Sequence, residues 1–99
     1  MSVNKYTGTL TIKVRGQEET ANVVIFPVTR AKEAGGGWEC LVTVEFRGAK
    51  HQDSFYLPDG PIRERKLTDG LQGSVARMPA PLQNVNVRRA GFVPQLVKH

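Results

Sequence analysis

Side chains alternate in character between residues 6 and 15. Apolar residues and one glycine take the even positions, while threonines and basic residues take the odd positions. Successive side chains of a β-strand point to opposite faces of a sheet, so this pattern predicts a strand with one buried face and one face in water. A half-buried strand requires neighbouring strands, and we therefore expect the chain to fold around a sheet.

Three more segments carry strand patterns, at residues 20–28, 38–47 and 51–57. Residues 38–47 repeat the alternation, whereas residues 23–26 are apolar on both faces, which predicts a more buried position for that strand. Pro27 has no N–H to donate to a sheet and marks a bulge, an edge or the end of its strand.

Short polar segments separate these strands. Residues 16–19 and 48–50 are predicted turns, and residues 29–37, which contain three consecutive glycines, are predicted to form a flexible loop with at most one helical turn. In an up-and-down meander the two turns lie at the same end of the sheet. That end gathers Arg15, Arg47, Lys50 and His51, together with Glu18 and Glu19.

A helical stripe runs through residues 61–78. The apolar positions follow the spacing i, i+4, i+8, i+11, which places them on one face of a helix. They are Leu67, Leu71, Val75 and Met78. Two glycines in this segment weaken the helix by about 1 kcal/mol each relative to alanine. The alternative is a hairpin that turns at residues 69–70, an Asp-Gly pair, but its flanks lack strand alternation, so the helix is favoured.

The last part of the chain is predicted to contain a fifth strand at residues 83–89, where Val85 and Val87 alternate with polar residues. Residues 92–99 are expected to form a tail that packs against the sheet, with Pro94 preventing a regular helix. The packing residues of this tail are Phe92, Val93, Leu96 and Val97.

This element order, β-β-β-β-α-β, predicts a single domain of residues 1–99 in the α+β class. We expect an antiparallel meander of about five strands with one helix packed on one face, because short connections favour hairpins and the helix must bury its apolar stripe. A small all-β barrel is the alternative. The fourth and fifth strands are the candidates for the sheet edges.

The formal net charge of +5 is unevenly distributed along the 99 residues. Residues 1–60 sum to zero, so the excess lies entirely in residues 61–99. Such an asymmetry is typical of chains that meet an anionic partner, although it also serves solubility. The candidate binding residues are Arg63, Arg65, Lys66, Arg77, Arg88 and Arg89.

Residue types that carry catalysis or bind metals are scarce. A structural zinc site needs four closely spaced ligands, and the Cys and His residues are only Cys40, His51 and His99. On a strand, His51 and Asp53 point to one face and Ser54 to the other, so these three side chains cannot form a nucleophilic relay. We therefore expect no catalytic residue, no metal and no cofactor, and we do not expect an enzyme.

The single cysteine, Cys40, cannot form an internal disulfide and favours a reducing compartment. The longest apolar run, residues 23–28, is far shorter than the roughly 20 residues that cross a bilayer. A soluble, cytoplasmic protein without a membrane partner is the expectation.

Two functions remain after these exclusions. The favoured one is a non-enzymatic interaction module that binds a protein partner through a sheet edge or through the basic C-terminal third. The alternative is electrostatic binding of nucleic acid through that same third. The exposed positions of residues 6–15 are threonines and basic residues, without the aromatic side chains on which sheet proteins stack bases, and this favours the protein partner.

Overall fold

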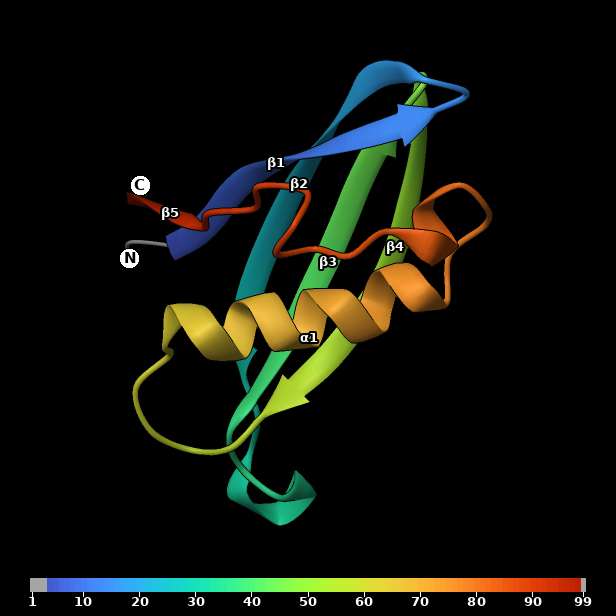
Figure 1. Ribbon diagram of the computed structural model, residues 1–99. Helices are drawn as coiled ribbons and strands as arrows, with labels where there is room; N and C mark the ends of the chain where they lie inside the picture. The colour runs from blue at the N-terminus through green and yellow to red at the C-terminus, as the bar shows by residue number, and fades with distance from the viewer. Residues whose placement is uncertain (1–3, 99) are drawn as a thin grey trace.

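The computed structural model describes residues 4–98, which form one five-stranded antiparallel sheet with an α-helix on one side (Figure 1). The elements are β1 (Asn4–Val14), β2 (Gln17–Thr29), η1 (Lys32–Ala34), β3 (Trp38–Phe46), β4 (Ala49–Leu57), α1 (Glu64–Ala76), η2 (Leu82–Asn84) and β5 (Gln95–Lys98). The strand order is β4-β3-β2-β1-β5. The predicted α+β class and element order are confirmed, and the sheet is open rather than closed into a barrel.

The predicted alternation places the core between the sheet and α1. Leu10 and Ile12 of β1 are buried on the same face as the apolar residues of β3. The helical stripe is confirmed for Leu67, Leu71 and Val75, which are fully buried. α1 is shorter than the predicted 61–78, and Met78 is buried just beyond its end. The rival hairpin at residues 69–70 is therefore wrong, since both residues lie inside α1.

Both long hairpins turn on the same dipeptide. Arg15-Gly16 joins β1 to β2 and Arg47-Gly48 joins β3 to β4, and all four residues have positive φ. This is the backbone of a two-residue type I′ turn, whose twist matches that of the flanking strands. The turns begin one residue earlier than predicted, because the arginines belong to the turns. Both turns lie at the same end of the sheet, as predicted, and Arg47 links the two hairpins there through hydrogen bonds of 2.7 and 2.5 Å to Glu19.

Residues 83–89 do not form a strand, which corrects the prediction. Val87 is buried, as the alternation suggested, but its N–H donates to Oε1 of Gln72 on α1 at 2.8 Å. Nε2 of Gln72 in turn donates to the carbonyl of Val85, also at 2.8 Å. A helix side chain thus satisfies the backbone groups that a neighbouring strand would otherwise have paired.

The fifth strand comes instead from residues 95–98, which pair with β1 in an antiparallel register. Of the four tail residues predicted to pack, only Phe92 is buried, while Val97 is half-buried. Val93 and Leu96 are exposed, and for these two residues the prediction is wrong. Backbone pairing rather than apolar packing fixes the end of the described chain.

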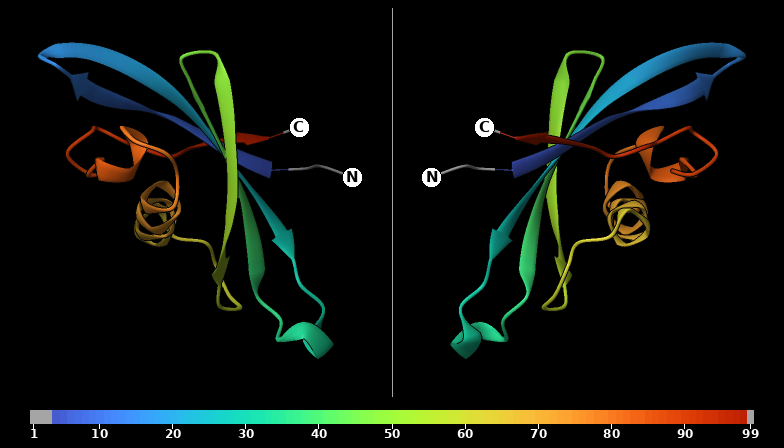
Figure 2. Two further views of the ribbon diagram at one scale, coloured as in Figure 1. Left: turned by 90° about the vertical axis from the view of Figure 1, so that its right-hand side faces the viewer. Right: turned by 90° about the vertical axis from the view of Figure 1, so that its left-hand side faces the viewer.

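α1 and residues 77–94 lie on one side of the twisted sheet, and no segment of residues 4–98 covers the other side, which we call the open face (Figure 2). The chain exposes 6481 Å² of surface, whereas a compact monomer of 10.9 kDa is expected to expose about 5,600 Å². Its extents of 47 × 25 × 23 Å are likewise elongated. The fold has two layers, and within residues 4–98 one face of the sheet is left uncovered.

Candidate protein-binding surface

An apolar patch occupies the open face. Side chains on this face come from even positions of β2 and β4 and from odd positions of β1 and β3, as the strand register requires. The patch consists of Val24, Phe26, Val28, Leu41 and Tyr56. Phe26 lies directly across from Leu41, and Val24 precedes it on the same face of β2. The apolar residues therefore form one continuous cluster over three strands.

This patch is exposed to a degree that is unusual for apolar side chains. The exposed fractions are 38% for Val28, 44% for Leu41 and 60% for Tyr56. A shallow hollow of about 710 Å³ lies beside them, lined by Phe26, Leu41 and Lys5 among others. Scattered apolar residues are normal on a protein surface, but a contiguous cluster marks an interaction site.

Tyr56 is held in place at one corner of the patch. The guanidinium of Arg30 lies 4.5 Å from the centre of the Tyr56 ring, a cation–π contact. The Tyr56 hydroxyl donates to Oε2 of Glu39 at 3.5 Å, the limit of a hydrogen bond. Arg30 is itself fixed by a hydrogen bond to the carbonyl of Ala34 in η1. A restrained, exposed tyrosine suits an interface, because little conformational entropy is lost when a partner covers it.

Charges on the open face nearly balance. Its charged side chains in the described range are Lys5, Lys13, Lys50, Glu18, Glu39 and Glu45, together with Arg30, which lies over the Tyr56 ring. Two lysines stand directly across from glutamates, in the pairs Lys13–Glu18 and Glu45–Lys50. The face therefore carries a net charge of only +1 although the whole chain carries +5, so most of the excess positive charge lies elsewhere.

The six basic residues predicted to bind an anion do not lie together. Arg63, Arg65 and Lys66 are at the start of α1, and Arg77 follows its last residue. A helix of 13 residues is about 20 Å long, so these two groups are well separated. Arg65 and Arg88 do line one hollow, but the carboxylate of Glu64 lines it as well.

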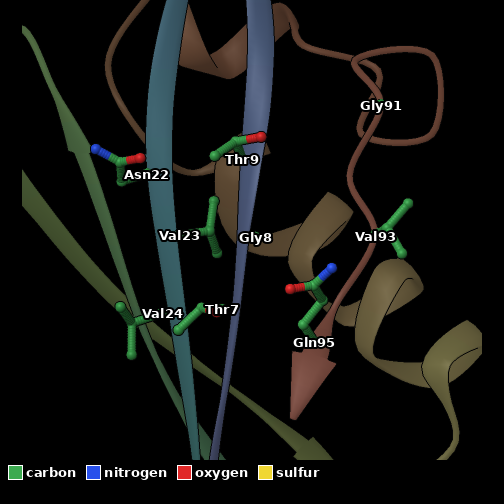
Figure 3. A pocket seen from close by; sticks show the side chains of 9 residues that line it. All are labelled: Thr7, Gly8, Thr9, Asn22, Val23, Val24, Gly91, Val93 and Gln95. Carbon is green, nitrogen blue, oxygen red and sulfur yellow. The ribbon is translucent and has the colours of Figure 1, made fainter. Parts of the chain in front are cut away.

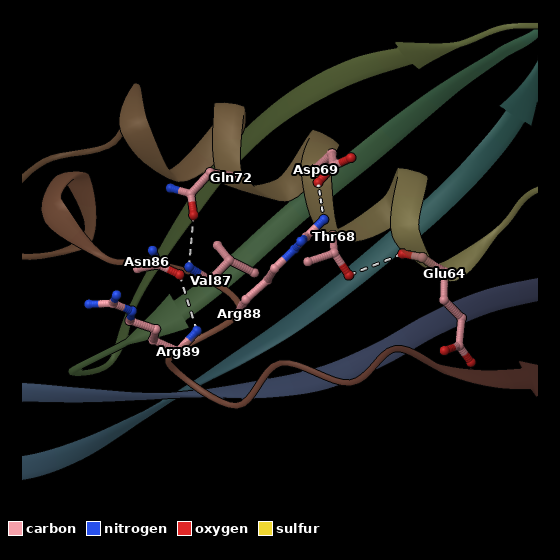
Figure 4. A network of polar contacts seen from close by, with 8 residues as sticks. All are labelled: Glu64, Thr68, Asp69, Gln72, Asn86, Val87, Arg88 and Arg89. Atoms are coloured by element: carbon pink, nitrogen blue, oxygen red, sulfur yellow. Dashed lines mark hydrogen bonds and ion pairs between the residues drawn. The ribbon is translucent and has the colours of Figure 1, made fainter.

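Two of the six basic residues are engaged by carboxylates. Nη2 of Arg88 lies 2.9 Å from Oδ1 of Asp69 on α1, and the backbone N–H of Arg89 donates to Oδ1 of Asn86 (Figure 4). Nη2 of Arg77 lies 2.5 Å from Oδ2 of Asp53 on β4. These contacts attach the basic segment to its own domain and reduce its attraction for a separate anion.

The Asp53 carboxyl shows how these contacts act. Burial raises the pKa of Asp53, but hydrogen bonds from Arg77 and Ser74 and the positive charge of Arg77 outweigh burial, so the pKa lies below its ordinary value. The Ser74 hydroxyl is fully buried and has no hydrogen-bond partner in the described range. We attribute the lower pKa of Asp53 mainly to Arg77, which donates two hydrogen bonds to its carboxylate.

One hollow in the described part of the chain has no titratable side chain in its lining. It lies between β1 and residues 91–95 and is lined by Thr7, Thr9, Asn22 and Gln95 (Figure 3). Burial raises the pKa of the Cys40 thiol to about 11, which keeps it protonated and unreactive at neutral pH. Among residues 4–98, no three His, Cys, Asp or Glu side chains gather closely enough to hold a metal ion. No helix in the same range is long and apolar enough to cross a membrane.

Comparison with known proteins adds no family. No protein-family model, curated protein or solved structure matches the chain. The site is therefore defined by its own geometry.

Sequence reasoning missed the apolar patch, although part of its signal was visible. Residues 23–26 were predicted to be buried because they are apolar on both faces, and Val23 and Ile25 are indeed buried. Val24 and Phe26 are only half-buried, because the second layer expected over them is absent from residues 4–98.

Proposed function

We propose that this chain is a small, non-enzymatic interaction module that binds a protein partner through the open face. The observation that carries the proposal is the contiguous apolar patch, with Leu41 and Tyr56 about half exposed. Burial of apolar surface away from water is favourable, and a restrained tyrosine at the corner of the patch is a typical interface anchor. The proposed setting is the cytoplasm, which suits a chain with one unpaired cysteine.

The open face supports the proposal better than the two surfaces that the sequence indicated. The β4 edge carries polar residues at positions 50–54, a composition that discourages unwanted strand pairing. The basic C-terminal third has Arg77 and Arg88 bound to carboxylates of the same chain. Nucleic-acid binding through that third remains the alternative, and it predicts salt-sensitive binding of oligonucleotides that is lost on charge reversal at Arg63 and Arg65.

Cysteine footprinting in the native cell tests the proposal. Cys40 is buried and weakly reactive, so a cysteine introduced on the surface supplies nearly the whole maleimide signal. Thr43→Cys places the probe beside the apolar patch, and Thr11→Cys places a matched probe on the same face but outside the patch. We expect Thr43→Cys to react at least about tenfold more slowly in cells than as dilute purified protein, because a partner excludes the reagent.

Thr11→Cys is expected to react at similar rates in both settings. Equal rates for Thr43→Cys in cells and in dilute solution would refute the proposal, since the open face would then be uncovered where the protein works. Slower labelling of both variants would indicate general crowding rather than a partner on the patch.

A further inference from the structure

We infer that the partner on the open face is a second copy of this chain, so that two sheets pack face to face. This inference rests on the proposed function and names its occupant. Three features of the face carry it: its charge, its twist and its area.

The charge of the open face suits an identical surface. In an isologous pair each face meets a copy of itself, so a face with a strong net charge would repel its partner. Here the described lysines and glutamates of the face are equal in number and Arg30 adds one positive charge, so the net charge of the face is only +1. Lys5 and Glu39 have no cross-strand partner of opposite charge. Both signs are therefore present for contacts across the interface. An acidic partner would instead be drawn to the other side of the molecule, where most of the excess positive charge lies.

The twist of the sheet also favours a copy. The two hairpins diverge visibly along the sheet, so a flat surface would touch only part of the open face (Figure 2). Two sheets with the same twist stack in an aligned sandwich, about 30° apart, with their side chains interdigitated. Such packing would bury the second face of β2 and give residues 23–26 the two-sided burial that their composition predicts.

The area agrees with a dimer of modest affinity. Seven residues of each of the four long strands and the four residues of β5 outline roughly 500 Å² per copy, or about 1,000 Å² in total, at about 4.8 Å between strands and about 3.3 Å per residue. Specific interfaces bury about 1,200–2,000 Å², and weaker associations lie somewhat below that range. The chain as a whole, ends included, exposes roughly 900 Å² more than a compact monomer of its mass would expose. One face-to-face contact would account for a little over half of this surplus.

Sedimentation velocity on the purified full chain, in reducing buffer, tests the inference. We expect the mass to rise from 10.9 kDa toward twice that value between about 1 µM and about 1 mM protein. Leu41→Lys adds a charge at the centre of the patch and should raise the dissociation constant at least about tenfold. Thr11→Lys adds the same charge to the same face outside the patch and should change the dissociation constant less than about threefold. Circular dichroism and thermal unfolding establish that both variants are folded.

A wild-type chain that stays at 10.9 kDa up to the highest concentration overturns the inference without needing any variant. A dimer that Leu41→Lys and Thr11→Lys weaken equally, or not at all, overturns it too, because the contact would then lie elsewhere. Monomeric protein combined with slow labelling of Thr43→Cys in cells would leave the proposed function standing with a different protein as partner. Fast labelling in cells would instead remove the proposed function itself.

Discussion

Replacing Gly70 by alanine tests the packing of α1 on the sheet. A Cβ at Gly70 would lie 2.6 Å from Cζ of the Phe55 ring and closer still to Cδ1 and Cε1. Carbon atoms pack favourably at about 3.5–4.0 Å, so the ring or the helix must move. Gly73 on the same helix is the matched control, because a Cβ there would meet only Nη1 of Arg77, at 3.7 Å.

The two substitutions should therefore change the free energy of unfolding in opposite directions. Replacing a glycine inside a helix by alanine raises the free energy of unfolding by about 1 kcal/mol, and Gly73→Ala should show most of this stabilisation. Overpacking a core costs about 1–3 kcal/mol, and the three short contacts at Gly70 place that site near the upper value. Gly70→Ala should thus lose about 2 kcal/mol net. For a domain of this size, that loss lowers Tm by roughly 8–16 °C.

Urea unfolding followed by circular dichroism measures both changes in the free energy of unfolding. The slope of that free energy against urea concentration must be the same for the variants and the original chain. The double variant Phe55→Leu/Gly70→Ala adds an internal check, since a leucine vacates the ring positions and should relieve at least about 1 kcal/mol of the Gly70→Ala loss. Equal stabilisation by Gly70→Ala and Gly73→Ala would refute the reasoning, because Phe55 could not then lie against Gly70.

Three further predictions concern single side chains. The Cys40 thiol, with its pKa raised to about 11 by burial, should react with a thiol reagent at neutral pH only on the timescale of unfolding, and rapid labelling of the native chain would contradict its burial. Because the pKa of Asp53 is lowered in the fold, the stability from its pairing with Arg77 is present above the unfolded pKa of about 3.9 and is lost as the pH falls through the lower folded value. In urea titrations at a series of pH values, Asp53→Asn should reduce this loss of unfolding free energy at acid pH. An unchanged loss would exclude the pairing. Ser74→Ala removes a buried hydroxyl without a geometric partner and should stabilise the chain by about 0.5 kcal/mol, whereas a loss above about 1 kcal/mol would place a hydrogen bond between Ser74 and Asp53 in solution.

The regular elements were predictable because their side-chain periods are local. Alternation in β1 and β3 and the stripe on α1 follow directly from strand and helix geometry. The segment at residues 83–89 shows where such reasoning stops. Its valines correctly indicated a buried face, but a strand is defined by its backbone partners, and Gln72, a side chain more than ten residues away, takes that place.

The candidate site was harder to predict, because it depends on which face of the sheet the described chain leaves uncovered. The six basic residues were visible as a cluster in sequence, yet the length of α1 separates Arg63 from Arg77, and Asp53 and Asp69 engage two of the six. Val24 and Phe26 were visible as half of a two-faced apolar run. A sequence pattern states that a residue prefers burial, but it does not state whether the same chain supplies the cover.

We therefore expect the two sides of the sheet to have separable roles. Val42 and Val44 are buried under α1 and contribute to folding, whereas Leu41 between Cys40 and Val42 points to the open face and is 44% exposed. A substitution at an exposed position away from special contacts usually changes stability by less than about 0.5 kcal/mol. Leu41→Lys should accordingly weaken association while leaving unfolding nearly unchanged. If it instead destabilised the isolated chain as strongly as a core substitution does, the patch would belong to the folding core, and its exposure would not indicate a partner.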